Sequence, residues 1–442
     1  MRPMLVLVAT LCLGAQATNP CAADLPDPSQ IELLTGSEVK ALVQRDFIQF
    51  DPRYVENREQ FGRRLAGLGL RLASLQKAGN EMECSNEIYL EAKWLHGYTA
   101  DWPRLNKRLD ELSESLGQLD QAFATRQSPE SGLWGACYEE PFFKIEATLL
   151  ALIQLAEVGE APALEVHLPP PFDQHSTALE HVRSLLVSDI AHTGVDNRGE
   201  LGNITTVASL AYFKDYIQEY LDTKVDVLPR NEGGPGAKTQ EYRQAFSDYV
   251  GAWQDPISGY WGPWYLSGDR LYKTADLSFT FHIVSFRRGQ VELWSEIIST
   301  TQAIEKEPYP FGWRHEGDFT NHNNYDVAKV FFYGWPHMSP EQRRIAASSI
   351  RDMLHWTLTS SLQLDGSFKT IPSFFSSMGA DFYFGVSFLR TIGFWDRAKR
   401  FWTEEDFPEA GAICERIKAK LVAMALKSHE SKSALTYLGN SC

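Results

Sequence analysis

The sequence is poor in positive charge and in long apolar stretches. Its 442 residues carry 42 Lys and Arg against 57 Asp and Glu, a formal net charge of −15. Because affinity for nucleic acid depends on clustered cations, this balance argues against a nucleic-acid partner. Beyond Leu13 no apolar run is long enough to cross a bilayer, so we expect no membrane span.

Cysteine is also scarce, and its placement bears on the compartment. Arg2 and an apolar run from Met4 to Leu13 are followed by small residues, the layout of a secretory signal peptide. We therefore predict that residues 1–23 are a signal peptide and that the protein is secreted or periplasmic. Cleavage after Ala23 leaves an even number of cysteines, typical of disulfides in an oxidising compartment, whereas cleavage after Ala17 leaves an odd number. The four that remain after Ala23 are Cys84, Cys137, Cys414 and Cys442.

What the chain does contain is a recurring phrase of glycine, any residue and a large apolar residue. It begins at Gly132, Gly199, Gly259, Gly317 and Gly366. The segments 127–135 and 254–262 agree further, at Gln, Pro, Ser, Gly, Trp and Gly. Internal repetition of this kind indicates a repeat architecture.

Amphipathic helices alternate with apolar helices between these phrases. The amphipathic set is expected at 57–76, 105–123, 177–190, 239–253 and 292–304, and in the helix that Ser339 and Gln342 begin with a capping box. The apolar set is expected at 84–95, 142–155, 204–216, 277–286, 327–333 and 382–389, and a last helix at 410–425. This alternation indicates an inner ring of apolar helices enclosed by an outer ring of amphipathic helices. We predict an all-α (α/α)6 toroid over residues 30–430 as a single domain, with a C-terminal tail at 431–442; a linear solenoid is the alternative.

The glycine phrase resembles the aromatic repeat of the terpenoid cyclase and protein prenyltransferase superfamily. The resemblance covers residues 127–392, its closest single copy is 363–368, and it implies the α/α-toroid fold. It does not imply an activity, because the Asp-x-Asp-Asp acid of the cyclases and the Asp-x-Cys zinc ligands of the prenyltransferases have no counterpart. We therefore expect no cofactor and no metal.

In a toroid the inner helices begin at one end, so polar residues near their starts share one opening. Cys84, Cys137 and His322 each lie five residues after a glycine, at Gly79, Gly132 and Gly317. A structural disulfide is expected for the two cysteines, with a Cys/Cys/His metal site as the alternative. The candidate catalytic residues at these starts are Glu140, Asp326, His322, Asp276 and Asp381. The candidate substrate-binding residues are Tyr138, Glu139, Trp264, Trp313, His315, Asn324, Tyr325 and Tyr383. Helix capping alone also explains many Asn and Asp residues at such positions.

Carboxylates beside aromatic rings suit a sugar substrate. We predict a secreted, monomeric glycoside hydrolase acting on an oligo- or polysaccharide, with Glu140 as acid and Asp326 as base or nucleophile, whether retaining or inverting. The first alternative is a polysaccharide lyase that uses Tyr325 or His322 as base and Asn324 or Arg314 to neutralise a uronate carboxylate. A terpenoid-cyclase-like enzyme and a non-catalytic binding toroid are the others.

Overall fold

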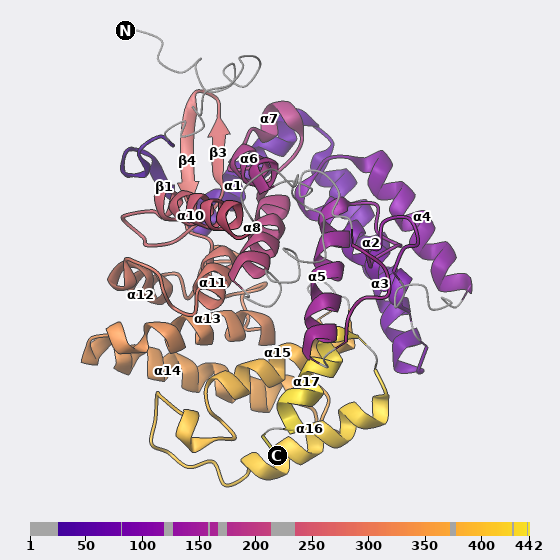
Figure 1. Ribbon diagram of the computed structural model, residues 1–442, viewed down its shortest axis with the longest axis vertical. Coiled ribbons are helices and arrows are strands. Elements are labelled where there is room, and N and C mark those ends of the chain that lie inside the picture. Colours follow the sequence, from indigo (N-terminus) through magenta and orange to yellow (C-terminus); the bar gives the residue numbers. More distant parts are fainter. Residues whose placement is uncertain are drawn as a thin grey trace.

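The protein is described by a computed structural model that covers residues 25–80, 82–118, 127–157, 160–166, 175–213, 235–371, 377–426, 428–439 and 441–442. The predicted signal peptide lies outside these residues. The described chain is mostly helical, with a small four-stranded sheet (Figure 1). No helix among the described residues is both long and apolar enough to cross a membrane.

The predicted alternation of helices is present in the described residues. The amphipathic set corresponds to α2 (Tyr54–Lys77), α4 (Trp102–Gln118), α6 (His175–Ser184), α10 (Pro235–Trp253), α12 (Trp294–Ala303) and α14 (Pro340–Trp356). The expected last helix is α16 (Ala410–Met424), and the helix expected at 177–190 ends already at Ser184. The apolar set corresponds to α3 (Glu83–Tyr98), α5 (Pro141–Glu157), α8 (Arg198–Phe213), α11 (Leu277–Phe286), α13 (Asn321–Gly334) and α15 (Met378–Thr391). The capping box that begins α14 is confirmed, because Ser339 Oγ accepts from the Gln342 N–H at 3.2 Å and Gln342 Oε1 accepts from the Ser339 N–H at 2.9 Å.

Three features of the fold were not predicted. Helices α1 (Gly36–Phe50) and α7 (Ile190–Thr193) have no counterpart in the expected set, and short 3-10 or π turns lie at Pro28–Gln30, Trp335–His337, Thr357–Ser361 and Arg397–Lys399. The expected tail at 431–442 is wrong, because its first residues form most of α17 (His429–Gly439). Ala434 and Leu438 of α17 are fully buried, and Cys442 is disulfide-bonded to Cys414 of α16.

The expectation of an all-α fold holds only in part, because the described chain is mostly helical but also contains a small sheet. Strands β1 (Glu32–Leu34), β2 (Val187–Ser188), β3 (Trp264–Ser267) and β4 (Arg270–Thr274) form a sheet in the order β1-β4-β3-β2. The hairpin of β3 and β4 is antiparallel, and β1 and β2 join its two edges in parallel. Because β1 and β2 come from parts of the chain distant from β3 and β4, the local sequence pattern does not predict them.

The recurring glycines take two different roles. Gly132, Gly259, Gly317 and Gly366 have positive φ angles between 67° and 90°, a backbone region that favours glycine. Gly199 instead lies in the first turn of α8, so the turn expected there is wrong. A Cβ on Gly199 would lie 2.5 Å from the Trp94 indole nitrogen, which shows that this glycine permits α3 and α8 to approach closely.

The repeated glutamine explains the sequence similarity between the two best-matched copies. Gln127 Nε2 donates to the carbonyls of Gly132 and Leu164, both at 2.8 Å. Gln254 Nε2 donates in the same way to the carbonyls of Gly259 at 2.8 Å and Glu292 at 3.1 Å. Each glutamine therefore joins its turn to the segment after the following helix, which is a structural role.

Successive apolar helices pack on one another. Helix α8 contacts α5 and α11, α11 contacts α13, α13 contacts α15, and α15 contacts α17. Figure 1 shows these helices gathered around the middle of the view, with α10, α12, α14 and α16 outside them. This packing brings the first turns of α8, α11, α13 and α15 together.

Candidate functional site

The first turn of α13 carries the residues from which the candidate site is built. Thr320 begins the helix, because its Oγ1 accepts from the N–H of Asn323 at 3.1 Å. The side-chain amide of Asn323 donates to the Trp313 carbonyl at 2.8 Å and so fixes the preceding loop. His322 and Asp326 lie four residues apart and therefore share one face of the helix.

Asp326 is fully buried and only partly satisfied. Its Oδ2 accepts a hydrogen bond from the Tyr309 hydroxyl at 3.2 Å and lies 3.8 Å from His322 Nδ1. Its Oδ1 has no hydrogen-bond partner within the described structure. His322 Nδ1 is also 3.2 Å from the side-chain oxygen of Asn323. One buried carboxyl group, one hydroxyl and one imidazole thus meet at α13.

The protonation states follow from burial. Removal from water raises the pKa of Asp326 well above its usual range, and the hydrogen bond from Tyr309 offsets only part of this effect. Removal from water lowers the pKa of His322 to about 3. Burial thus favours the uncharged forms of both groups, the acid form of Asp326 and the neutral imidazole of His322.

Aromatic rings surround this pair. The His322 ring lies edge-on to Phe384 of α15, with centroids 4.4 Å apart, and to Tyr309, with centroids 5.3 Å apart. The ring centroid of Tyr325 lies 5.2 Å from that of Phe281 and 6.3 Å from that of Tyr383. The His322 side chain is 15% exposed, whereas Asp326 is inaccessible, so His322 is the group that a ligand can reach.

Asp276 is engaged elsewhere. It caps α11 by accepting from the Phe279 N–H at 3.0 Å, and it accepts two hydrogen bonds from Arg198, at 2.7 and 3.2 Å. Arg198 also donates to the Tyr98 hydroxyl at 2.7 Å. With its oxygens occupied, Asp276 is a structural partner of Arg198, and its proposed catalytic role is not supported.

Asp381 of α15 is the second candidate carboxyl group with an unsatisfied atom. The residue is 4% exposed and its Oδ2 has no hydrogen-bond partner within the described chain. Burial raises its pKa to about 7, and a hydrogen bond with Thr370 and then the positive charge of Lys93 offset part of this effect. Asp381 therefore remains a candidate for proton transfer.

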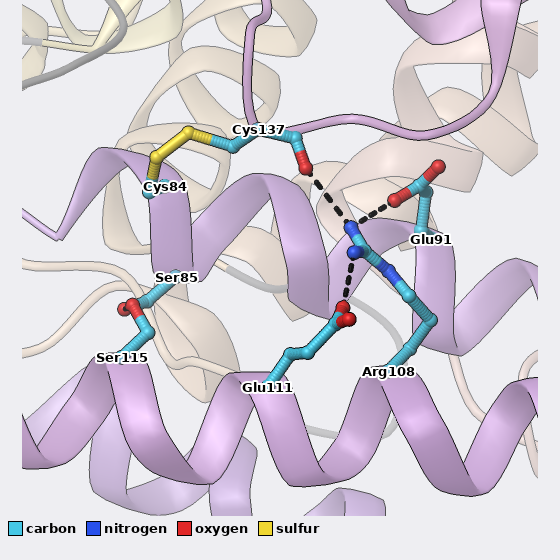
Figure 2. Close-up of a disulfide and its surroundings, with 7 residues drawn as sticks. All are labelled: Cys84, Ser85, Glu91, Arg108, Glu111, Ser115 and Cys137. Carbon is cyan, nitrogen blue, oxygen red and sulfur yellow. Dashed lines mark hydrogen bonds and ion pairs between the residues drawn. A yellow bond between two sulfur atoms is a disulfide. The ribbon is translucent and has the colours of Figure 1, made fainter.

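The segment 137–140 belongs to a separate network around Arg108 (Figure 2). The Arg108 guanidinium pairs with Glu91 and Glu111 and donates to the Cys137 carbonyl at 3.0 Å. The Cys137 side chain forms the disulfide with Cys84, so the expected disulfide is confirmed and the sulfurs are not available as metal ligands. This network anchors the loop before α5 to α3 and α4.

Glu139 and Glu140 are held in the same network. Glu140 pairs with Arg104, and Glu139 pairs with Lys107 at 2.6 Å. Tyr138 stacks on Phe143 with centroids 5.0 Å apart. Glu140 is engaged by Arg104 in this network, so the structure does not support its role as the catalytic acid.

The remaining predicted binding residues differ in accessibility. Trp264 and Trp313 are 2% and 1% exposed, so both pack in the core and neither presents a face to a ligand. Asn324 is buried, and its amide is 3.4 Å from Thr357 Oγ1. His315 is half-buried, and this burial is the main reason that its pKa is lowered.

Sequence reasoning missed Tyr309, Arg198 and Lys93. Tyr309 lies in an irregular segment, Arg198 lies in the first turn of α8 next to a glycine phrase, and Lys93 lies within α3. A survey of cations near the glycine phrases would have found Arg198.

Comparison of the chain with protein-family models, with curated proteins and with solved structures found no match.

Proposed function

We propose that the protein is an acid–base enzyme, and that its reaction is an elimination of the polysaccharide lyase type with His322 as the base. The observation that supports the proposal is the imidazole of His322, whose Nδ1 lies 3.8 Å from the buried carboxyl group of Asp326. General acid–base catalysis requires a proton acceptor and a proton donor in one water-poor site. The ring of Phe384 contacts His322, and the rings of Tyr325 and Tyr383 contact Phe384.

The proposed step removes the proton from the carbon next to a uronate carboxylate. His322 accepts this proton, a carbon–carbon double bond forms, and the neighbouring carbon–oxygen bond breaks with its electron pair going to the leaving oxygen. The leaving oxygen is protonated by His322 or by Tyr309. Asp326 lies behind His322 and acts by positioning the imidazole ring rather than by touching the substrate.

The test is the absorbance of the product. The new double bond is conjugated with the carboxylate and absorbs in the near ultraviolet, so uronate-containing polysaccharides are screened by spectrophotometry. His322→Gln is expected to lower kcat by roughly 10²- to 10⁴-fold, while Glu140→Gln is a control that leaves kcat nearly unchanged. Equal activity in His322→Gln and the unaltered protein would contradict the role of His322.

A glycoside hydrolase is the second candidate, and Asp381 favours it. Asp326 and Asp381 lie on the packed helices α13 and α15, and burial raises the pKa of both. Hydrolysis requires one protonated and one ionised carboxyl group, which this pair can supply in place of Glu140. New reducing ends without ultraviolet absorbance, lost in Asp381→Asn, would identify hydrolysis. Ligand binding without turnover would instead indicate a binding protein.

We also propose that five of the apolar helices, together with α17 in place of α3, close into the ring of an (α/α)6 toroid. The series α5, α8, α11, α13, α15 and α17 is continuous in its contacts. Closure is supported by the pKa of Glu146 on α5, which desolvation and then the charge of Glu430 on α17 raise. Small-angle scattering of the purified protein tests closure, because a linear solenoid is longer than a ring.

Export is proposed from the same set of observations. The disulfides Cys84–Cys137 and Cys414–Cys442 are typical of an oxidising compartment, and the apolar segment at the N-terminus precedes them. Mass spectrometry of the mature protein tests the predicted cleavage after Ala23.

A further inference from the structure

Four aromatic side chains at the C-terminal end of α13 form a cluster that we call the aromatic patch. Its members are Phe332 and Tyr333 of α13, Trp335 of the following turn, and Phe401 of the segment after α15. The ring centroids of Phe332 and Phe401 lie 5.5 Å apart, and those of Trp335 and Phe401 lie 5.2 Å apart. Phe332 is 39% exposed and the other three are partly exposed, whereas Phe331 fills the core. Exposed apolar patches of this kind mark binding surfaces.

Positive charges lie against these rings. The guanidinium carbon of Arg343 lies 5.6 Å from the centroid of the Trp335 ring, and Arg343 Nε donates to the Trp335 carbonyl at 3.2 Å. The Lys329 ammonium nitrogen lies 6.0 Å from the centroid of Phe332 and 5.7 Å from that of Tyr333. These distances are those of cation–π contacts. The aromatic patch is therefore bordered by cations from α13 and α14.

Two arginines beside the aromatic patch form no ion pair within the described chain. One is Arg343, and the other is Arg288, an exposed residue whose neighbour Gly289 packs against the Tyr333 ring. The carboxylates of α14 and of the segment around Phe401 already have partners: Glu341 with Arg344, Glu405 with Arg351, Glu404 and Asp406 with Arg397, and Asp396 with Lys399. Arg288 and Arg343 can therefore pair with an anion from outside the chain.

Rings and arginines together fit one class of ligand. Aromatic faces stack on the C–H face of a sugar ring, and a guanidinium binds a carboxylate through two parallel hydrogen bonds. An uncharged apolar partner would bury Arg343 without a carboxylate, which is unfavourable. The net charge of −15 argues against nucleic acid. A sugar polymer that carries carboxylates is therefore the partner that this surface fits.

We propose that the aromatic patch is a second binding surface for an acidic polysaccharide, separate from the candidate site. Phe332 follows His322 by ten positions on α13, so the two lie roughly 15 Å apart along the helix axis. The inference rests on the proposed function for the class of polymer, but it gives the patch no part in the chemistry. The patch holds a long chain while the candidate site acts on one linkage, so its loss should raise KM for the polymer and leave kcat unchanged.

Affinity electrophoresis at pH 7 tests this inference, with polygalacturonate or alginate in the gel and the methyl ester of polygalacturonate as the uncharged probe. We expect Phe332→Ala and Arg343→Met each to weaken binding of the acids by roughly 3- to 10-fold. Arg343→Met should leave binding of the ester unchanged. Leu364→Ala removes a more exposed apolar side chain, and Arg63→Met removes an exposed arginine paired with Glu59; both are controls that should bind like the unaltered protein. Thermal melts verify that each variant is folded, and Arg343→Met decides by itself if Phe332→Ala is not.

The outcomes separate this inference from the proposed function. If the variants lose affinity for the acids but no unsaturated product forms, the elimination is wrong and the binding surface stands. If neither acid retards the unaltered protein, or if both variants bind the acids as the unaltered protein does, the inference is wrong even where an unsaturated product is observed. An equal loss for acid and ester in Arg343→Met also overturns it. A dimer in sedimentation that Phe332→Ala dissociates, without retardation by either acid, would show that the patch binds a second copy of the chain instead.

Discussion

Replacing Asp276 by Ala is the most direct test of the structural role given to this residue. Asp276 is inaccessible to solvent and the Arg198 side chain is 10% exposed. The two residues share two hydrogen bonds, at 2.7 and 3.2 Å, and Asp276 also caps α11. The Ala substitution therefore leaves a guanidinium buried without its carboxylate and removes a helix cap.

The size of the effect follows from these contacts. Removing one partner of a buried ion pair lowers the free energy of unfolding by about 3–5 kcal/mol, because the other charge remains buried. Loss of an Asp cap by itself lowers it by about 1 kcal/mol. We expect Asp276→Ala to lose at least about 3 kcal/mol at pH 7.

Urea denaturation followed by circular dichroism measures this change. The double variant Arg198→Met with Asp276→Leu is the control, because replacing a whole buried ion pair by apolar residues is often neutral or stabilising. We expect this double variant to be more stable than Asp276→Ala. A loss below about 1 kcal/mol in Asp276→Ala, or a double variant as unstable as the single one, would refute the reasoning about the buried charge.

Three further predictions concern stability. Burial raises the pKa of Asp381 from 3.8 to about 7, so the folded state holds this proton more tightly than the unfolded chain. The resulting stabilisation is present below about pH 4 and is lost as the pH rises to 7. Denaturation series measured across that range should show no such loss for Asp381→Asn. Cys84→Ala removes the disulfide to Cys137, which closes a loop over a separation of 53 residues; from chain entropy we expect the free energy of unfolding to fall by about 4 kcal/mol. Urea denaturation without reductant measures this change, and an unchanged midpoint would count against the disulfide. Gly259→Ala should destabilise the protein far more than Gly268→Ala in thermal melts, although both glycines have positive φ. A Cβ on Gly259 would lie 2.7 Å from a backbone nitrogen, whereas one on Gly268 meets nothing within 4 Å. Equal losses would show that backbone strain alone matters.

The features that the sequence determined by itself are those set by neighbouring residues. The spacing of apolar residues predicts helix α4, whose leucines at 105, 109, 112 and 116 are buried. The capping box at Ser339 and the positive φ at Gly259 depend on a few adjacent residues, and both were predictable. The polar first turn of α13, with His322 and Asp326, was recognisable for the same reason.

The tertiary structure decided which of these polar residues have partners. The sequence predicts Glu140 as a catalytic acid, whereas in the structure Glu140 is paired with Arg104, 36 positions away. Asp276 and Arg198 are 78 positions apart. The sheet likewise joins β1 to β4 across more than two hundred residues. A helix forms from contacts three and four residues apart and can be read locally, but burial, ion pairing and the resulting pKa of a carboxyl group depend on which distant segments fold against it.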